Sequence, residues 1–309
     1  VDIEVEYYEI LKSCALYPEN NECTCSELNR QMNFLKIKLI EYLSSLNIDE
    51  TIINYKIKEI IYAPFNPDDI SIKGMIHLVD HFKSWINKGD KEWGYRFSQY
   101  NLLRNDLLIK KNVEFCNKFS EDSFSGEILE FILRGQYPKE ILLPDNIMLL
   151  DFNYTPTSKF YLTSNMGFGH NQIHGALDST ESVIFGYGDE LEDHYNEIVK
   201  LNDNECLQNI KSIKYLESNK YREMLSFIES SPFQIFVMGH SCGNSDRTLL
   251  NTLFEHKNCV SIKPYYYQKE DGSDNYLNII QNVSRSFTDM KLMRDRVVNK
   301  TFCEPLPQN

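Results

Sequence analysis

The sequence predicts an α/β protein, in which a Rossmann-like parallel sheet follows a large helical region. Two observations lead to this fold class. Apolar residues recur at helical spacing through much of residues 1–145, whereas short apolar runs bounded by Pro, Gly and Asn alternate with helical stretches after Pro144. We therefore expect a mainly helical insertion or cap over residues 1–145. A Rossmann-like α/β region is expected over residues 146–309, in one compact unit with the first.

The clearest helical pattern lies in residues 28–46. Its apolar positions recur at steps of four and three, and they are Leu28, Met32, Leu35, Leu39, Tyr42 and Leu46. Residues 76–85 and 102–119 carry similar, weaker stripes. Such stripes are more typical of helices packing on helices than of partner-binding surfaces, so they predict a helical core.

Four apolar runs predict strands in the second half, at residues 147–152, 182–185, 234–238 and within 259–267. Residues 246–256 separate the last two runs and have helical spacing. A strand, a helix and a strand with short joints predict a right-handed parallel crossover. Ligands of such sheets collect at the carboxyl ends of the strands, so the residues after each run are the candidates for a site.

Composition narrows the classes of function. The 309 residues contain 32 Lys and Arg against 45 Asp and Glu, a formal net charge of −13. A polyanion needs a basic surface, so broad nucleic-acid binding is not expected, although a local basic groove stays open. No apolar run approaches the ~20 residues of a membrane span, and no secretory leader is visible. We expect a cytoplasmic protein without a membrane partner.

Eight cysteines are scattered along the chain, which is typical of reduced thiols rather than of a disulfide scaffold. Cys23 and Cys25 form the only close pair, and no second pair follows at zinc-ligand spacing. No metal is expected. The sequence starts at Val1 rather than at Met, and we expect the natural start to lie before it.

The residues between the first two predicted strands offer polar groups. Asn153 and Thr155 could hold a ribose or an amide, although such residues also form ordinary turns. His174, followed by Gly175, is a residue type whose unperturbed pKa suits a general base near neutrality, but taken alone the pattern favours a structural histidine. His170 lies four residues earlier, where a helix would allow a shared metal, but the surrounding glycines speak against a helix.

Further glycines follow the remaining strands. Gly186 and Gly188 permit close backbone approach. Asp189 could accept hydrogen bonds from sugar hydroxyls, or it could equally be a solvated loop carboxylate. Residues 239–243 match the G-x-S-x-G of a serine hydrolase, yet the only later histidine is His256, on the next helix. A loop at a helix N-terminus that binds phosphate or ribose is the better interpretation. Its candidate contacts are Gly239, His240, Ser241, Asn244 and Asp246, with Asp246 also expected as the N-cap.

Taken together, these motifs resemble the bacteriophage abortive-infection AbiH family. The resemblance rests on Leu-Pro-Asp before the first strand and on residues 152–155, 173–175, 184–189 and 239–246. Residues 263–266, Met293, Arg294 and the helix that ends in residues 41–43 also match. The order and spacing of several motifs make the resemblance more specific than any one of them.

That family is in turn similar to the sirtuin-type fold, a Rossmann-like sheet with a helical insertion that binds NAD. The resemblance implies that His174 is the catalytic base and that Asn153 holds the ribose or positions water. It also implies that Gly239, Ser241 and Asn244 hold the adenosine ribose and the phosphates. Thr155 stands where a sirtuin has an aspartate, the sirtuin zinc cysteines are absent, and the Gly-Asn-Gly-Phe-Asp that usually opens AbiH-like chains is not found.

The resemblance therefore implies an anti-phage defence protein that hydrolyses NAD to nicotinamide and ADP-ribose, without a required cofactor. Two other classes stay open, a nucleotide-binding sensor without chemistry and a nuclease using His170 and His174. A nucleotide ligand and a phage-derived trigger or defence partner protein are the expected partners. A homo-oligomer stays open.

Overall fold

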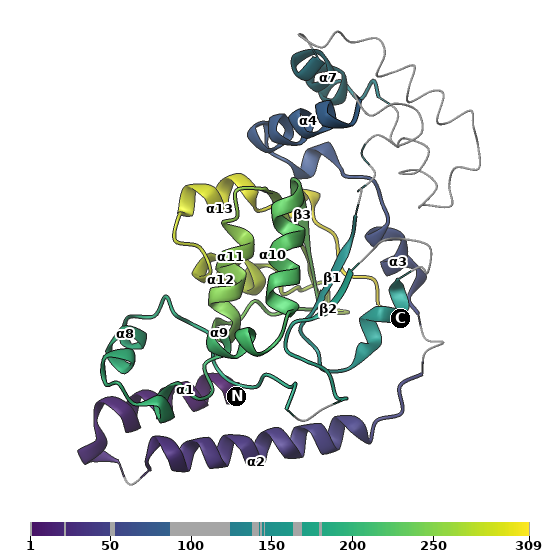
Figure 1. Cartoon of the computed structure of the whole chain (residues 1–309). Helices are drawn as coiled ribbons and strands as arrows, with labels where there is room; N and C mark the ends of the chain where they lie inside the picture. The colour runs from purple at the N-terminus through teal and green to yellow at the C-terminus, as the bar shows by residue number, and fades with distance from the viewer. Residues whose placement is uncertain are drawn as a thin grey trace.

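The computed structural model describes residues 2–21, 23–49, 53–86, 124–137, 142, 144, 146–162, 169–178 and 181–308 (Figure 1). Its longer helices are α1 (Ile3–Leu16), α2 (Cys25–Ser44), α3 (Tyr55–Ile61), α4 (Ile72–Ile86), α7 (Phe124–Leu133), α8 (Asp193–Lys200), α10 (Lys220–Ser230), α11 (Arg247–Phe254), α12 (Tyr276–Arg285) and α13 (Met290–Arg296). A single turn forms α9 (Lys211–Lys214), and short 3-10 helices include η2 (Pro67–Asp69), η4 (Pro156–Tyr161), η5 (Asn204–Leu207) and η7 (Asn244–Asp246). The strands are β1 (Met148–Asp151), β2 (Gly169–Gln172), β3 (Phe233–Met238) and β4 (Cys259–Tyr265).

The strands form two parallel pairs, β1 with β2 and β3 with β4. The predictions of a parallel arrangement and of strands at β1, β3 and β4 are confirmed. The helix predicted between the last two strands is α11. The structure is thus a mixed α/β protein with short parallel sheets.

The strand predicted at residues 182–185 is wrong, and the partner of β1 is instead β2. Val183 and Ile184 are buried, as their apolar side chains suggest, but the Ile184 N–H donates to the His174 carbonyl outside any ladder. β2 lacks an apolar pattern because two of its inward side chains are polar. Asn171 is one of them, and its Nδ2 donates to the Lys220 carbonyl at 2.7 Å.

The helical predictions hold at α2 and α4, whereas residues 102–119 lie outside the described residues. The predicted apolar stripe of α2 is buried only in its first half. Leu28 and Met32 pack in the core, but Leu35 and Tyr42 are exposed. Figure 1 shows the reason, because the shorter α1 covers only the first part of α2.

Within the described residues, apolar side chains form two clusters that stabilise the fold. The larger joins β3 and β4 to helices α10–α13, which lie on one side of the strands in Figure 1. The smaller joins α1 and α2 to the segment around Tyr187 and Ile198. A buried ion pair between Asp69 and Lys263, 2.9 Å long, ties η2 to β4. Within the described part of the chain, no helix is long and apolar enough to span a membrane.

Candidate functional site

A buried polar cluster lies at the carboxyl ends of the strands, with Asp246 at its centre. The His174 Nε2 lies 3.0 Å from Asp246 Oδ1 and 3.3 Å from the Tyr215 hydroxyl. His174 follows β2, whereas Asp246 ends the loop after β3, so the parallel strands bring residues from distant parts of the sequence to one edge. Both side chains are buried.

Two residues that sequence reasoning missed complete this cluster. The Lys211 Nζ lies 2.9 Å from Asp246 Oδ1 and 2.8 Å from Glu4 Oε2. The other Glu4 oxygen accepts the Gly186 N–H at 3.2 Å. Glu4 belongs to the first turn of α1, so the amino-terminal helix also reaches this edge. Neither residue lies in an apolar run or a motif, and the sequence carried no signal for them.

Burial and neighbouring charges set the protonation of the cluster. Burial is the largest influence on the pKa of His174 and lowers it, and the Lys211 ammonium adds to this effect. Burial opposes the ionisation of Asp246, but Lys211 and His174 outweigh it and hold the Asp246 pKa well below its usual range. For Lys211, the two carboxylates outweigh burial and raise the pKa. The cluster therefore contains a neutral imidazole, an aspartate and an ammonium.

The neutral His174 ring keeps one lone pair. Because its Nε2 faces a carboxylate and a hydroxyl, the ring proton belongs on that nitrogen. Nδ1 is then the acceptor nitrogen. A general base needs such a lone pair within reach of a substrate proton.

A second imidazole shares the same carboxylate and faces a cavity. The His240 Nε2 lies 3.6 Å from Asp246 Oδ2. His240 and Asn153 line a cavity of about 580 Å³ between β1 and β3, together with Phe152. The Phe152 ring contacts His240 at a centroid distance of 4.1 Å and meets His174 edge-on at 5.3 Å. Phe152 therefore lies between the cavity and His174, so His240 is the imidazole that a ligand in the cavity meets first.

Asn153 and Thr155 follow β1 as predicted. The Asn153 backbone N–H and Nδ2 both donate to Asp151 Oδ1, at 2.8 and 3.1 Å. Ser158 donates to the other Asp151 oxygen at 2.6 Å, and His170 lies 3.5 Å from it. This arrangement leaves the exposed Asn153 at the mouth of the cavity with its amide oxygen available. Thr155 precedes η4 and has no side-chain capping bond.

The predicted glycines have packing roles. A Cβ on Gly175 would lie 1.9 Å from the Ser182 carbonyl oxygen, and one on Gly186 would lie 2.0 Å from that of Asn209. Gly188 packs against the Ser245 backbone and the Lys211 side chain, next to the cluster. Gly239, with φ +74°, has open space around it at the end of β3. Gly239 is thus the glycine whose surroundings leave room for a ligand.

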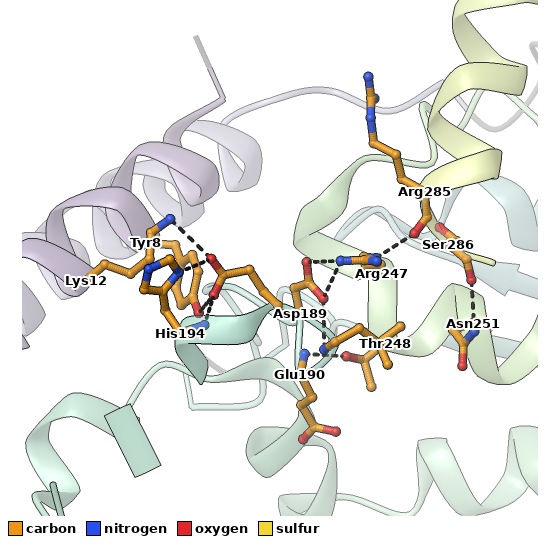
Figure 2. A network of polar contacts seen from close by, with 12 residues as sticks. Tyr8, Lys12, Asp189, Glu190, His194, Arg247, Thr248, Asn251, Arg285 and Ser286 are labelled. Atoms are coloured by element: carbon orange, nitrogen blue, oxygen red, sulfur yellow. Dashed lines mark hydrogen bonds and ion pairs between the residues drawn. The ribbon is translucent and has the colours of Figure 1, made fainter. Parts of the chain in front are cut away.

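Asp189 forms an ion pair with Arg247. Figure 2 shows its carboxylate facing Arg247, with Arg247 Nη1 at 3.0 and 3.3 Å from the two oxygens. Arg247 also donates to the Arg285 carbonyl, and the Thr248 hydroxyl accepts the Glu190 N–H beside it. Burial is the largest influence on the Asp189 pKa and raises it, against the lowering effect of Arg247. This network joins the segment after Tyr187 to α11 and α12.

The loop 239–246 connects β3 to α11 as predicted, with one correction. Asp246 directly precedes α11, but its side chain makes no capping bond, because it is bound to Lys211 and His174 instead. Ser241 is exposed, and its carbonyl accepts from Asn282 at 2.8 Å. Asn244 begins η7.

A family model for bacteriophage abortive infection AbiH matches residues 18–267. This match covers well over half of the chain. The chain belongs to the AbiH family. No curated protein and no solved structure matches it significantly.

The AbiH match spans the residues around which the candidate site is built. The structure brings His174, His240 and Asp246 together, and Asn153 lines the same cavity as His240. Asp189 pairs with Arg247 instead, and the Ser241 carbonyl accepts from Asn282. Glu4 lies outside the matched range. Among the described residues, no group of three or more His, Cys, Asp or Glu could hold a metal ion.

Proposed function

We propose that this AbiH protein acts in abortive infection by hydrolysing the nicotinamide glycosidic bond of NAD. The site would lie at the carboxyl ends of β1 and β3, in a Rossmann-like, sirtuin-type arrangement. The single observation that carries the proposal is the pair of imidazoles, His174 and His240, on the two oxygens of Asp246 beside Asn153.

The charge of the cluster favours this chemistry. Cleavage of a glycosidic bond passes through a ribose with oxocarbenium character, which is positively charged. Asp246 and Glu4 supply two carboxylates against the one ammonium of Lys211. Fixed negative charge in a buried site stabilises a developing positive charge strongly.

The reaction balances with the groups present. Water attacks C1′ of the nicotinamide ribose, and the bond from C1′ to the pyridinium nitrogen breaks with its electron pair going to that nitrogen. Nicotinamide leaves as a neutral molecule, and the proton from the attacking water passes to an imidazole. We assign the ribose-positioning role to Asn153. His174 is the predicted base, and His240 is the second candidate because it faces the cavity.

The test incubates the full chain with NAD and measures nicotinamide, using protein from uninfected and phage-infected cells. We expect His174→Ala, His240→Ala and Asp246→Asn to lower the rate, and loss of the true base should cost about 10²–10⁴-fold. His256→Ala is the matched control, because His256 pairs with Glu229 away from the site. Unchanged NAD in every sample of the unsubstituted chain would contradict the proposal.

One observation favours a second candidate, a nucleotide sensor without chemistry. The His174 side chain is only 5% exposed, and its Nε2 is already bound to Asp246 and Tyr215. A ring enclosed in this way suits a structural role. Tight NAD binding measured by calorimetry, without nicotinamide release in any sample, would select this function.

A further inference from the structure

A second cluster of polar side chains, apart from the one around Asp246, joins η4 to the first strand pair. Asp151 ends β1, and its Oδ2 accepts the Ser158 hydroxyl proton at 2.6 Å. The His170 Nε2, from β2, lies 2.8 Å from the Ser158 oxygen and 3.5 Å from the same carboxylate oxygen. One serine hydroxyl therefore contacts both a carboxylate and an imidazole, the groups that most often take a proton from a nucleophile.

The protonation of this cluster leaves the Ser158 oxygen able to form a bond. Burial opposes the ionisation of Asp151, but the hydrogen bonds that it accepts, first from His170, outweigh burial and lower the Asp151 pKa. An ionised carboxylate only accepts hydrogen bonds, so the Ser158 proton points at Asp151. A hydroxyl oxygen has two lone pairs, of which His170 can occupy one. The other lone pair stays available for a ligand atom.

The same carboxylate connects Ser158 to Asn153, the residue to which we assign the ribose. Asp151 Oδ1 accepts the Asn153 backbone N–H at 2.8 Å and Asn153 Nδ2 at 3.1 Å. Asn153 and Ser158 also line the same cavity of about 580 Å³. A nicotinamide ribose held by Asn153 would therefore lie next to the Ser158 oxygen.

Ser158 differs in this respect from the other hydroxyls of the cavity wall. Thr157 and Tyr161 line the cavity as well. The Tyr161 hydroxyl accepts the Asn54 backbone N–H at 3.3 Å. Within the described part of the chain, Ser158 is the hydroxyl of this cavity that a carboxylate contacts. It is therefore the hydroxyl of this wall with a proton acceptor in place.

We propose that Ser158 is an ADP-ribose acceptor, so that part of the NAD cleaved at this site modifies the protein itself. This inference rests on the proposed NAD hydrolysis. The Ser158 oxygen attacks C1′ of the nicotinamide ribose, and the bond from C1′ to the pyridinium nitrogen breaks with its electron pair going to that nitrogen. The Ser158 proton passes to Asp151 Oδ2, 2.6 Å away, and nicotinamide leaves as a neutral molecule. Serine competes with water because a well-oriented group in the same molecule acts at an effective concentration of about 10⁵–10⁸ M.

The test incubates the full chain with NAD that is radiolabelled in its adenosine phosphate, under the conditions of the hydrolysis assay. Protein-bound label and released nicotinamide are measured in the same sample. Their ratio is the readout, because a change in the hydrolysis rate alone does not move it. We expect the label on Ser158, located by mass spectrometry of its peptide. The label should survive neutral hydroxylamine, which cleaves an ester on Asp151 but not an acetal on serine.

Substitutions on the cavity wall make the test specific. Ser158→Ala should lower the ratio by about tenfold or more, because no nucleophile held in place then competes with water. Ser158→Thr keeps a hydroxyl and should recover part of the ratio. Thr157→Ala, at the neighbouring hydroxyl of the same wall, is the matched control and should keep the full ratio.

The outcomes separate this inference from the proposed hydrolysis. Nicotinamide release by the unsubstituted chain without label on Ser158 would overturn the acceptor role alone. An equal ratio for Ser158→Ala and the unsubstituted chain would do the same. Label that disappears when excess unlabelled ADP-ribose is added would also overturn it, because the label would then come from the free product. Neither release nor label in any sample would overturn both proposals.

Discussion

Lys211 Nζ and Asp246 Oδ1 lie 2.9 Å apart, and the two side chains are 1% and 9% exposed. The Glu4 carboxylate holds the other side of the ammonium at 2.8 Å. Two segments far apart in sequence, α1 and the loop after β3, are therefore joined through one lysine. Removing that lysine would leave two carboxylates in a buried place without a positive partner.

Lys211→Met should consequently lower the free energy of unfolding by about 3–5 kcal/mol, the usual cost of breaking a buried ion pair on one side. Lys214→Met is the matched control on the same helical turn, because Lys214 pairs with the exposed Glu217. That change should cost less than about 1 kcal/mol. Urea unfolding measures both, and equal losses would contradict the assignment of Lys211 as the central cation.

The buried His174 should make the protein less stable in mild acid. Its pKa is lowered in the folded state, first by burial and then by Lys211, from an unfolded value of 6.5. Below pH 6.5, His174 is therefore protonated in the unfolded chain but stays neutral in the folded chain. The free energy of unfolding consequently falls as the pH falls, until the pH reaches the pKa of folded His174. The slope can reach about 1.4 kcal/mol per pH unit for one group.

His174→Gln should flatten this slope between pH 7 and pH 5, measured by urea unfolding at each pH. His194→Gln should act in the opposite direction. The exposed His194 has its pKa raised by Glu192, so it stabilises the folded state below the unfolded pKa and loses that effect as the pH rises through the folded value. Identical slopes for the wild type and His174→Gln would refute this account of His174.

Gly186→Ala should destabilise the fold by crowding the backbone at this position. The new Cβ would lie 2.0 Å from the Asn209 carbonyl oxygen, and backbone must move to admit it. Overpacking of this kind costs about 1–3 kcal/mol or more. Gly243→Ala is the control, since its Cβ would meet only the Ser241 hydroxyl at 3.6 Å. Thermal unfolding should show a lower Tm than the wild type for Gly186→Ala and an unchanged Tm for Gly243→Ala.

Arg247→Ala should loosen the contact between α11 and the segment that follows Tyr187. It leaves the buried Asp189 carboxylate with its backbone partner Leu191 but without a cation, at a cost of about 2 kcal/mol given the partial exposure of Arg247. Arg247→Lys should recover part of this loss, because one ammonium cannot bind both the Asp189 carboxylate and the Arg285 carbonyl as the guanidinium Nη1 and Nε do. Arg222→Ala, at an exposed position of α10, should change Tm little. An equal Tm for Arg247→Ala and Arg222→Ala would show that the pair is not stabilising.

Sequence by itself determined the elements whose apolar residues are periodic. It predicted α2, α4 and α11, the strands β1, β3 and β4, their parallel direction, and the edge where His240 and Asp246 lie. These succeed because burial of apolar side chains is a local pattern with a fixed period, and because parallel strands share one carboxyl edge.

Only the tertiary structure decided the rest. β2 is a strand because its backbone pairs with β1, although its Gly-His-Asn-Gln has no apolar period. Lys211 binds Glu4 across 207 residues of sequence and Asp246 across 35, and no local pattern records such contacts. The burial of His174 behind Phe152 likewise depends on packing. The Phe152 ring lines the cavity and covers the candidate base, so His174 lies near the cavity but does not line it.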